Sequence, residues 1–179
     1  MRFASMRNLD ISNGEGVGVS LFVQGCDRHC FNCFNPDTWD FNGGKEWTEE
    51  TKNKFIKLID RPYINRISVL GGEPLAEQNL DEVLSLIKEI RISFPEKTIW
   101  LYTGYKFEDL INGIHYPLDS EWEDKVLRQS IVKQCDVLID GEYIDERRDI
   151  TLKWRGSSNQ RVIDVKQSLT QNKVVLYCN

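Results

Sequence analysis

Short apolar stretches recur along the chain and alternate with stretches of helical periodicity. Apolar side chains in residues 17–24 recur at every second position, which predicts a β-strand. In residues 80–93 they follow the spacing of one helix face, which predicts an amphipathic helix. The same patterns predict further strands at residues 67–70, 99–102, 137–140, 161–165 and 174–177, and further helices from a Thr48 cap through Ile59, at 107–111, and from a Ser120–Glu123 capping box to Lys133.

This alternation of strands and helices predicts an α/β fold with a parallel sheet flanked by helices. In such folds the carboxyl ends of the strands carry the functional residues. We therefore expect the segments after the first four of these strands to converge on one polar site. Each contains glycine beside a polar or metal-binding residue, and glycine lets a ligand approach the backbone closely. The four segments are Gly25–Cys33, Gly71–Pro74, Thr103–Tyr105 and Asp140–Glu142.

The chain length and composition are those of one ordinary globular domain. The 179 residues predict a single domain over residues 1–179, and 40% of the residues are hydrophobic while 28% are charged. No stretch is apolar for about 18 residues, and the N-terminus lacks the apolar core of a signal peptide, so we expect a cytoplasmic protein without a membrane partner. The formal net charge of −5 argues against nucleic acid as a partner.

Five cysteines are the unusual feature of the composition. Cys26, Cys30 and Cys33 lie on one loop after the first predicted strand. An odd number cannot pair fully in intramolecular disulfides, and three thiolates leave one position open on a tetrahedral zinc ion or on a cluster of four irons. An iron–sulfur cluster whose fourth iron binds a cofactor fits this number directly. A structural zinc site is the alternative, and the candidates for its fourth ligand are His29, Cys135 and Cys178.

The cysteine spacing and the motifs that follow it carry a family resemblance. Cys-x3-Cys-x2-Cys after the first strand, followed by Gly71-Gly72-Glu73-Pro74 at the end of the second, resembles the radical S-adenosylmethionine superfamily. An ordered set of motifs between about residue 10 and residue 165 is similar, more narrowly, to the family of activating proteins of anaerobic ribonucleotide reductase. These motifs are Asp10–Gly14, Leu21–Cys26, Cys33–Asn35, Thr38–Trp39, Gly71–Leu75, Ile99–Tyr105, Asp136–Gly141 and Trp154–Gln160.

The resemblance implies a fold, a cluster and a set of cofactor contacts. The fold is a partial (β/α) barrel of about five to six mostly parallel strands, of the radical S-adenosylmethionine type. Cys26, Cys30 and Cys33 would hold a [4Fe-4S] cluster, one per chain, whose fourth iron binds the methionine part of S-adenosylmethionine. The Gly-Gly-Glu segment is expected to meet the amino group of that cofactor, the residues around the third cysteine its adenine, and the ends of the next two strands its carboxylate or ribose hydroxyls. The residues with these expected contacts are Asn32, Cys33, Phe34, Gly71, Gly72, Glu73, Thr103 and Asp140.

The reaction implied is reductive cleavage of S-adenosylmethionine. The 5′-deoxyadenosyl radical then abstracts hydrogen from a glycine of the large anaerobic ribonucleotide reductase subunit, which makes that subunit a protein substrate. A flavodoxin- or ferredoxin-type protein is the expected electron donor, and a homodimer is an arrangement that the resemblance allows. The alternative function is that of another radical S-adenosylmethionine enzyme, either a different glycyl-radical activase or a deazapurine synthase.

Three further expectations concern individual segments and positions of the chain. Residues Gly156–Gln160 precede the fifth of these strands, so they reach the site only if the segment from Glu142 to Arg155 folds back across its mouth. The charged run Asp145–Asp149 is expected to be a solvated loop. Gly18 stands where related activases commonly carry arginine, which leaves a charged contact with the partner unsupported at that position.

Overall fold

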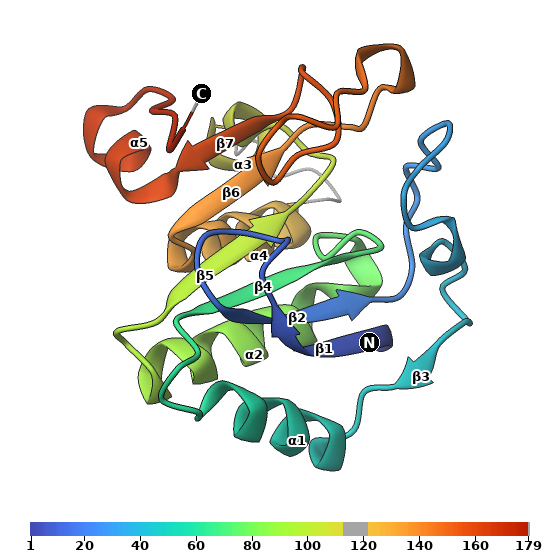
Figure 1. Cartoon of the computed structure of the whole chain (residues 1–179), viewed down its shortest axis with the longest axis vertical. Coiled ribbons are helices and arrows are strands. Elements are labelled where there is room, and N and C mark those ends of the chain that lie inside the picture. The colour runs from blue at the N-terminus through green and yellow to red at the C-terminus, as the bar shows by residue number, and fades with distance from the viewer. Residues whose placement is uncertain (113–121, 179) are drawn as a thin grey trace.

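The computed structural model describes residues 1–112 and 122–178, whose strands form one mixed sheet (Figure 1). The strands are β1 (Arg2–Asp10), β2 (Gly18–Val23), β3 (Lys45–Glu46), β4 (Arg66–Gly71), β5 (Thr98–Tyr102), β6 (Val137–Asp140) and β7 (Arg161–Asp164). Their order across the sheet is β3-β1-β2-β4-β5-β6-β7. The inner strands β2, β4, β5 and β6 pair in parallel, and the pairs at both edges are antiparallel.

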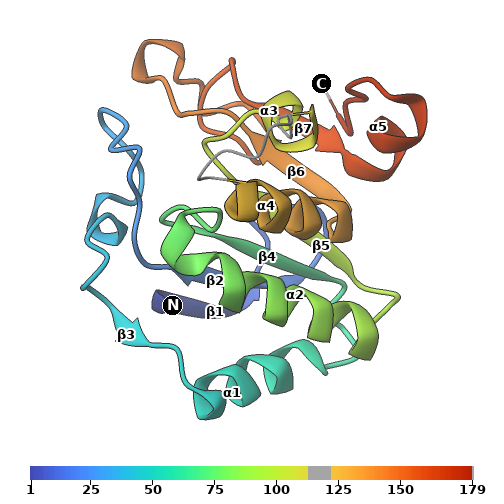
Figure 2. The same cartoon turned by 180° about the vertical axis from the view of Figure 1, so that it is seen from behind.

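Helices cover one face of this sheet. They are α1 (Glu49–Ile59), α2 (Leu80–Ser93), α3 (Phe107–Asn112), α4 (Trp122–Gln134) and α5 (Val165–Gln171). Figure 2 shows α1, α2 and α4 in front of the sheet, and Figure 1 shows them behind it. Between these layers lies the main apolar core, in which alternate residues of the strands, such as Ile67, Val69, Ile99 and Leu101, are fully buried. None of the helices in the described ranges has the length and apolar character of a membrane span.

Several helix and strand bounds agree with the prediction, because local sequence signals determine them. Helix α2 has the predicted bounds, and α1 begins after Thr48, whose hydroxyl accepts a hydrogen bond of 3.2 Å from the Thr51 amide. The four inner strands agree with the prediction to within one or two residues, and they are parallel as expected. Helix α4 extends to Gln134, while its expected Ser120 cap lies outside the described residues.

The edges of the sheet differ from the prediction. Strand β1 was not predicted, because most of its residues are polar or exposed and show no apolar alternation. The strand expected at 161–165 ends at Asp164, whose carboxylate accepts from the Gln167 amide and so begins helix α5. The strand expected at 174–177 is wrong, since this segment contributes one isolated bridge, between Ile163 and Leu176, beside β7. The expected count of five to six strands is therefore replaced by seven in the described residues.

The other face of the sheet carries no helix in the described residues (Figure 1); it is apolar over β5–β7, where Trp100, Ile139 and Val162 form a second cluster, and polar over β2 and β4. Residues 11–17 cross it, and they are held there by Arg66, whose guanidinium donates to the carbonyls of Asp10 and Asn13 and lies 3.4 Å from the Asp10 carboxylate. The Arg66 and Asp10 side chains are completely buried. Burial opposes ionisation of Asp10, but hydrogen bonds from Asn13, Ser20 and Ser12 outweigh it and lower the pKa of Asp10 to about 2. A buried ion pair thus anchors the loop between β1 and β2.

We predict that Asp10→Asn lowers the free energy of unfolding at pH 7 by about 3 kcal/mol, because it leaves the Arg66 guanidinium buried without its counter-charge. The pKa of Asp10 is lowered on folding, so its ionisation stabilises the fold fully above about pH 4 and progressively less as the pH falls towards 2. Urea unfolding from pH 7 to 2 should show the wild type and the variant converging over this window. Glu96→Gln, at an exposed turn, is the control and should follow the wild type. A gap between Asp10→Asn and the wild type that stays constant down to pH 2 would contradict the assignment.

Candidate metal and cofactor site

The loop that carries the three clustered cysteines follows β2 and has almost no regular structure. One short 3-10 turn, Pro36–Thr38, lies at its end. Backbone bonds fold the loop back on itself, from the Gly25 amide to the Thr38 carbonyl and from the Cys26 amide to the Trp39 carbonyl. His29 and Asn32 have positive φ angles of 48° and 53°, so the chain turns sharply between its cysteines.

The three cysteines form no disulfide and line one cavity of about 140 Å³. Cys26 is buried, and Cys30 and Cys33 are half-buried. Burial raises the pKa of Cys26 to about 11 and raises that of Cys30 as well, so metal binding here must displace protons from the thiols. Among the described residues, no three Cys, His, Asp or Glu side chains converge closely enough to hold a single metal ion. A [4Fe-4S] cluster suits such a set, because each thiolate binds a different iron.

Gly71, the last residue of β4, and Gly72 after it let the strand end pack closely against the residues that end β2 and begin the cysteine loop. A Cβ on Gly72 would lie 2.3 Å from the Gly25 carbonyl oxygen, and a Cβ on Gly71, whose φ is +110°, would lie 2.8 Å from the Phe22 Cα. The Glu73 amide donates to the same Gly25 carbonyl at 2.8 Å. These glycines therefore let two backbone segments of the chain itself approach each other closely.

The Glu73 carboxylate is buried beneath the site and is satisfied by the chain. It accepts hydrogen bonds from the Thr103 hydroxyl and from the amides of Leu75 and Gly104, each at 2.8–2.9 Å. Burial raises the pKa of Glu73, and these three donors oppose that shift. A carboxylate has about four acceptor positions, so one remains for a ligand. Glu73, shortly after β4, thus fixes Thr103 and Gly104 at the end of β5.

The structure brings together seven of the residues with expected site roles and leaves three outside. The cavity is lined by Cys26, Cys30, Cys33, Gly71, Gly72, Glu73 and Thr103, as the convergence of strand ends predicts. Asn32, Phe34 and Asp140 do not line it. His29 also lies outside, with its ring 4.7 Å from that of Trp39, and Cys135 is buried where its thiol meets the Ile131 carbonyl.

Residues 141–160 fold back over the cysteine loop, as their position in the chain required. The Asn32 side-chain amide donates to the Asp145 carboxylate at 2.9 Å, and the Phe34 ring packs edge-on against the Tyr143 ring, with the ring centres 5.0 Å apart. The Arg148 guanidinium lies over the Phe34 ring, and a Cβ on Gly156 would lie 2.6 Å from that ring. The charged run at 145–149 is mostly exposed, as expected of a solvated loop, and it also contacts the cysteine loop through Asp145 and Arg148.

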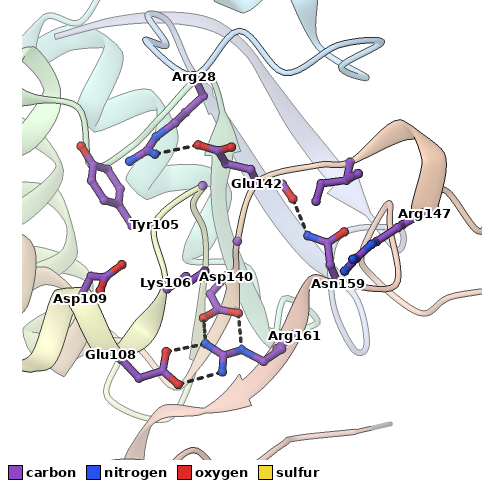
Figure 3. Close-up of a pocket in the computed structure, with 13 residues that line it drawn as sticks. Arg28, Tyr105, Lys106, Glu108, Asp109, Asp140, Glu142, Arg147, Asn159 and Arg161 are labelled. Carbon is purple, nitrogen blue, oxygen red and sulfur yellow. Dashed lines mark hydrogen bonds and ion pairs between the residues drawn. The ribbon is translucent and has the colours of Figure 1, made fainter.

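A second cavity, of about 1020 Å³, adjoins the first (Figure 3). Arg161 lines this cavity and binds two acids at once, Asp140 and Glu108, with the Glu108 contacts at 2.7 and 2.9 Å. The Asp140 carboxylate also accepts from the Phe107 amide at 2.9 Å. Asp140, expected beside the cofactor, thus lines the larger cavity and is already held by an arginine.

The cysteine cavity is also lined by residues that were given no site role from the sequence, among them Tyr102, Tyr143 and Gln160. The signal for Tyr102 was present, because strand alternation puts it on the face opposite Ile99 and Leu101. Its hydroxyl is buried and has no hydrogen-bond partner in the described residues. Tyr143 and Gln160 reach the cavity through the fold of the 141–160 segment, for which no periodic pattern exists.

The comparisons with known proteins agree with this geometry. Residues 12–163 match the family model of a 4Fe-4S single cluster domain, which defines the class of the site. The chain is 37% identical to the anaerobic ribonucleoside-triphosphate reductase-activating protein of Salmonella typhimurium and 35% identical to that of Escherichia coli K12, over 90% of this chain and 97% of each relative. The protein of the same name from enterobacteria phage T4 is 37% identical over 90% of this chain and 93% of its own. The chain belongs to the family of anaerobic ribonucleoside-triphosphate reductase-activating proteins.

We predict that Cys30→Ala abolishes cluster retention and leaves the fold intact, since Cys30 is half-buried on a loop outside the apolar core. Iron content and absorbance after anaerobic reconstitution measure retention, and circular dichroism measures the fold. Cys135→Ala is the matched control, because this buried thiol lies away from the cavity and should keep the full iron content. Collapse of the Cys30→Ala fold would instead indicate a structural metal.

Proposed function

We propose that this chain activates the anaerobic ribonucleotide reductase by installing a glycyl radical in it. The observation that carries the proposal is the meeting of three free cysteines with the Gly-Gly-Glu segment in one cavity, in a chain of this family. When bound, the cluster supplies the electron that cleaves S-adenosylmethionine to methionine and a 5′-deoxyadenosyl radical, which takes a hydrogen atom from a glycine of the reductase. The cofactors supply this chemistry, and the protein holds and shields them.

In this proposal Cys26, Cys30 and Cys33 hold the cluster, and the residues beside them hold S-adenosylmethionine. The remaining acceptor position of Glu73 is the contact for the cofactor's ammonium group, since a buried carboxylate binds a cation strongly. Thr103 supports this contact, because its hydroxyl already fixes the Glu73 carboxylate. The exposed Phe34 ring offers a stacking surface for adenine.

The remaining candidates for cofactor contact already contact other parts of the chain. Gly71, Gly72, Asn32 and the backbone at Cys33 stay candidates, as does Asp140, whose carboxylate would have to bind a ribose hydroxyl beside Arg161. The open sheet with helices on one face is compatible with the partial barrel of radical S-adenosylmethionine proteins, which we propose as its fold class.

Three properties of the working protein belong to the same proposal. A flavodoxin- or ferredoxin-type protein supplies the electron, the protein acts in the cytoplasm as one domain, and a homodimer is an admissible assembly. None of the comparisons favours the alternative of a different glycyl-radical activase or a deazapurine synthase, since the relatives described above share one name.

The proposal is tested by anaerobic reconstitution with iron and sulfide, followed by S-adenosylmethionine, a one-electron reductant and the anaerobic reductase. We expect 5′-deoxyadenosine and a glycyl doublet in the electron paramagnetic resonance spectrum of the reductase, both lost with Cys33→Ala. A protein that binds about four irons and yields no 5′-deoxyadenosine would refute it. A doublet on a different partner alone would refute the choice of reductase.

A further inference from the structure

The two cavities of the site share a boundary, and one ion pair occupies it. Arg28, Gly104, Gly141 and Glu142 line both the cysteine cavity and the larger cavity. The Arg28 guanidinium donates to the Glu142 carboxylate at 2.9 Å across this boundary (Figure 3). The pair joins the cysteine loop to the segment after β6.

Arg28 is held firmly, whereas Glu142 is free to turn. The Arg28 guanidinium lies 3.9 Å from the centre of the Tyr105 ring, and its stem passes over Gly104, where a Cβ would meet it at 3.2 Å. The Glu142 side chain is 51% exposed, and Arg28 is its only ionic partner in the described residues. The backbone at Glu142 stays in place, because its carbonyl accepts a hydrogen bond of 2.8 Å from the Asn159 side-chain amide. A half-exposed pair of this kind separates at small cost.

The larger cavity suits a segment of protein chain. It holds about 1020 Å³ against about 140 Å³ for the cysteine cavity, so only the larger one has room for such a segment. Charged groups of both signs and the glycines at 104 and 141 line it, which favours a polar backbone over an apolar ligand. The lining includes four basic residues, Arg28, Lys106, Arg147 and Arg161, and four acidic ones, Glu108, Asp109, Asp140 and Glu142.

We propose that Arg28 and Glu142 form a gate between the two cavities, and that a glycine-bearing segment of the reductase enters through the larger cavity and opens it. This inference rests on the proposed function. A hydrogen atom passes only between atoms in contact, so the glycine must cross the boundary to reach atoms held at the cysteine loop. On opening, Glu142 turns away and Arg28 stays on Tyr105, where its released Nη1 donates to a carbonyl of the entering segment.

The gate gives its two residues opposite effects on affinity for the reductase. Glu142→Ala removes the bond that must break, so more of the protein is ready to bind, and we expect the Kd to fall by about two- to fivefold. Arg28→Gln removes the donor to the entering carbonyl, and we expect the Kd to rise by about tenfold. In the Arg28→Gln background, Glu142→Ala should change nothing further, because the gate is already absent.

The measurement is the Kd of the reconstituted protein with S-adenosylmethionine for the full-length reductase, at fixed salt. Glu89→Ala is the matched control, since Glu89 pairs with Lys52 at 3.1 Å away from both cavities, and it should bind as the wild type does. Weaker binding of both variants would indicate that Glu142 contacts the reductase directly and would contradict the gate. An unchanged Kd in both variants would also contradict it. Thermal melting and iron content identify any variant that is altered in fold.

The same samples separate this inference from the proposed function. If the wild type produces no glycyl doublet on the reductase, the proposed function fails. If the wild type produces the doublet and the two variants do not shift affinity in opposite directions, the gate alone fails.

Discussion

The buried carboxylate of Glu73 is the interaction on which the arrangement of the site depends. A carboxylate without water must find donors within the chain, and here it takes them from Leu75, Thr103 and Gly104. Asn79 extends the linkage, since its side-chain amide donates to the carbonyls of Glu73 and Gln24. The ends of β2, β4 and β5 are thereby fixed relative to one another, at the edge where parallel strands present their carboxyl ends. The need to satisfy one buried charge therefore assembles a site from three distant parts of the sequence.

The cysteine loop depends on its neighbours in a different way. It has almost no regular structure of its own, and side chains from residues 141–160 hold its outer part through Asn32, Phe34 and Arg28. These contacts are polar or aromatic and mostly half-exposed, so each separates at smaller cost than a contact of the apolar core. The rigid part of the site is thus the strand ends, and the part able to rearrange is the cover. This division suits a protein whose substrate is another protein.

The sequence was informative wherever a local periodicity or a short motif carries the structure. Helix α2 and the four inner strands follow from apolar spacing, and the convergence of their ends follows from parallel topology. Strand β1 was not predicted from the sequence because only Phe3 and Asp10 among its residues are buried. Its pairing with β2 defines it, and apolar alternation does not. Asp140 lay at the expected strand end, but its ion pair with Arg161 depends on β7 crossing beside it, which spacing does not reveal. The 141–160 segment was recognisable by motif, yet its contacts are tertiary.

Charge explains why Arg28 has so central a place. Of the described residues that line the cysteine cavity, Arg28 is the only cation, and it shares this lining with three thiols and the carboxylates of Glu73 and Glu142. Burial, followed by nearby acidic groups, raises the pKa of the Cys26 and Cys30 thiols, so a fixed positive charge on the same loop lowers the cost of the thiolates that iron requires. Lysine could supply the charge, but it lacks the planar group that contacts the Tyr105 ring while donating to Glu142. The planar guanidinium therefore serves the loop, the thiolates and the boundary between the cavities from one position.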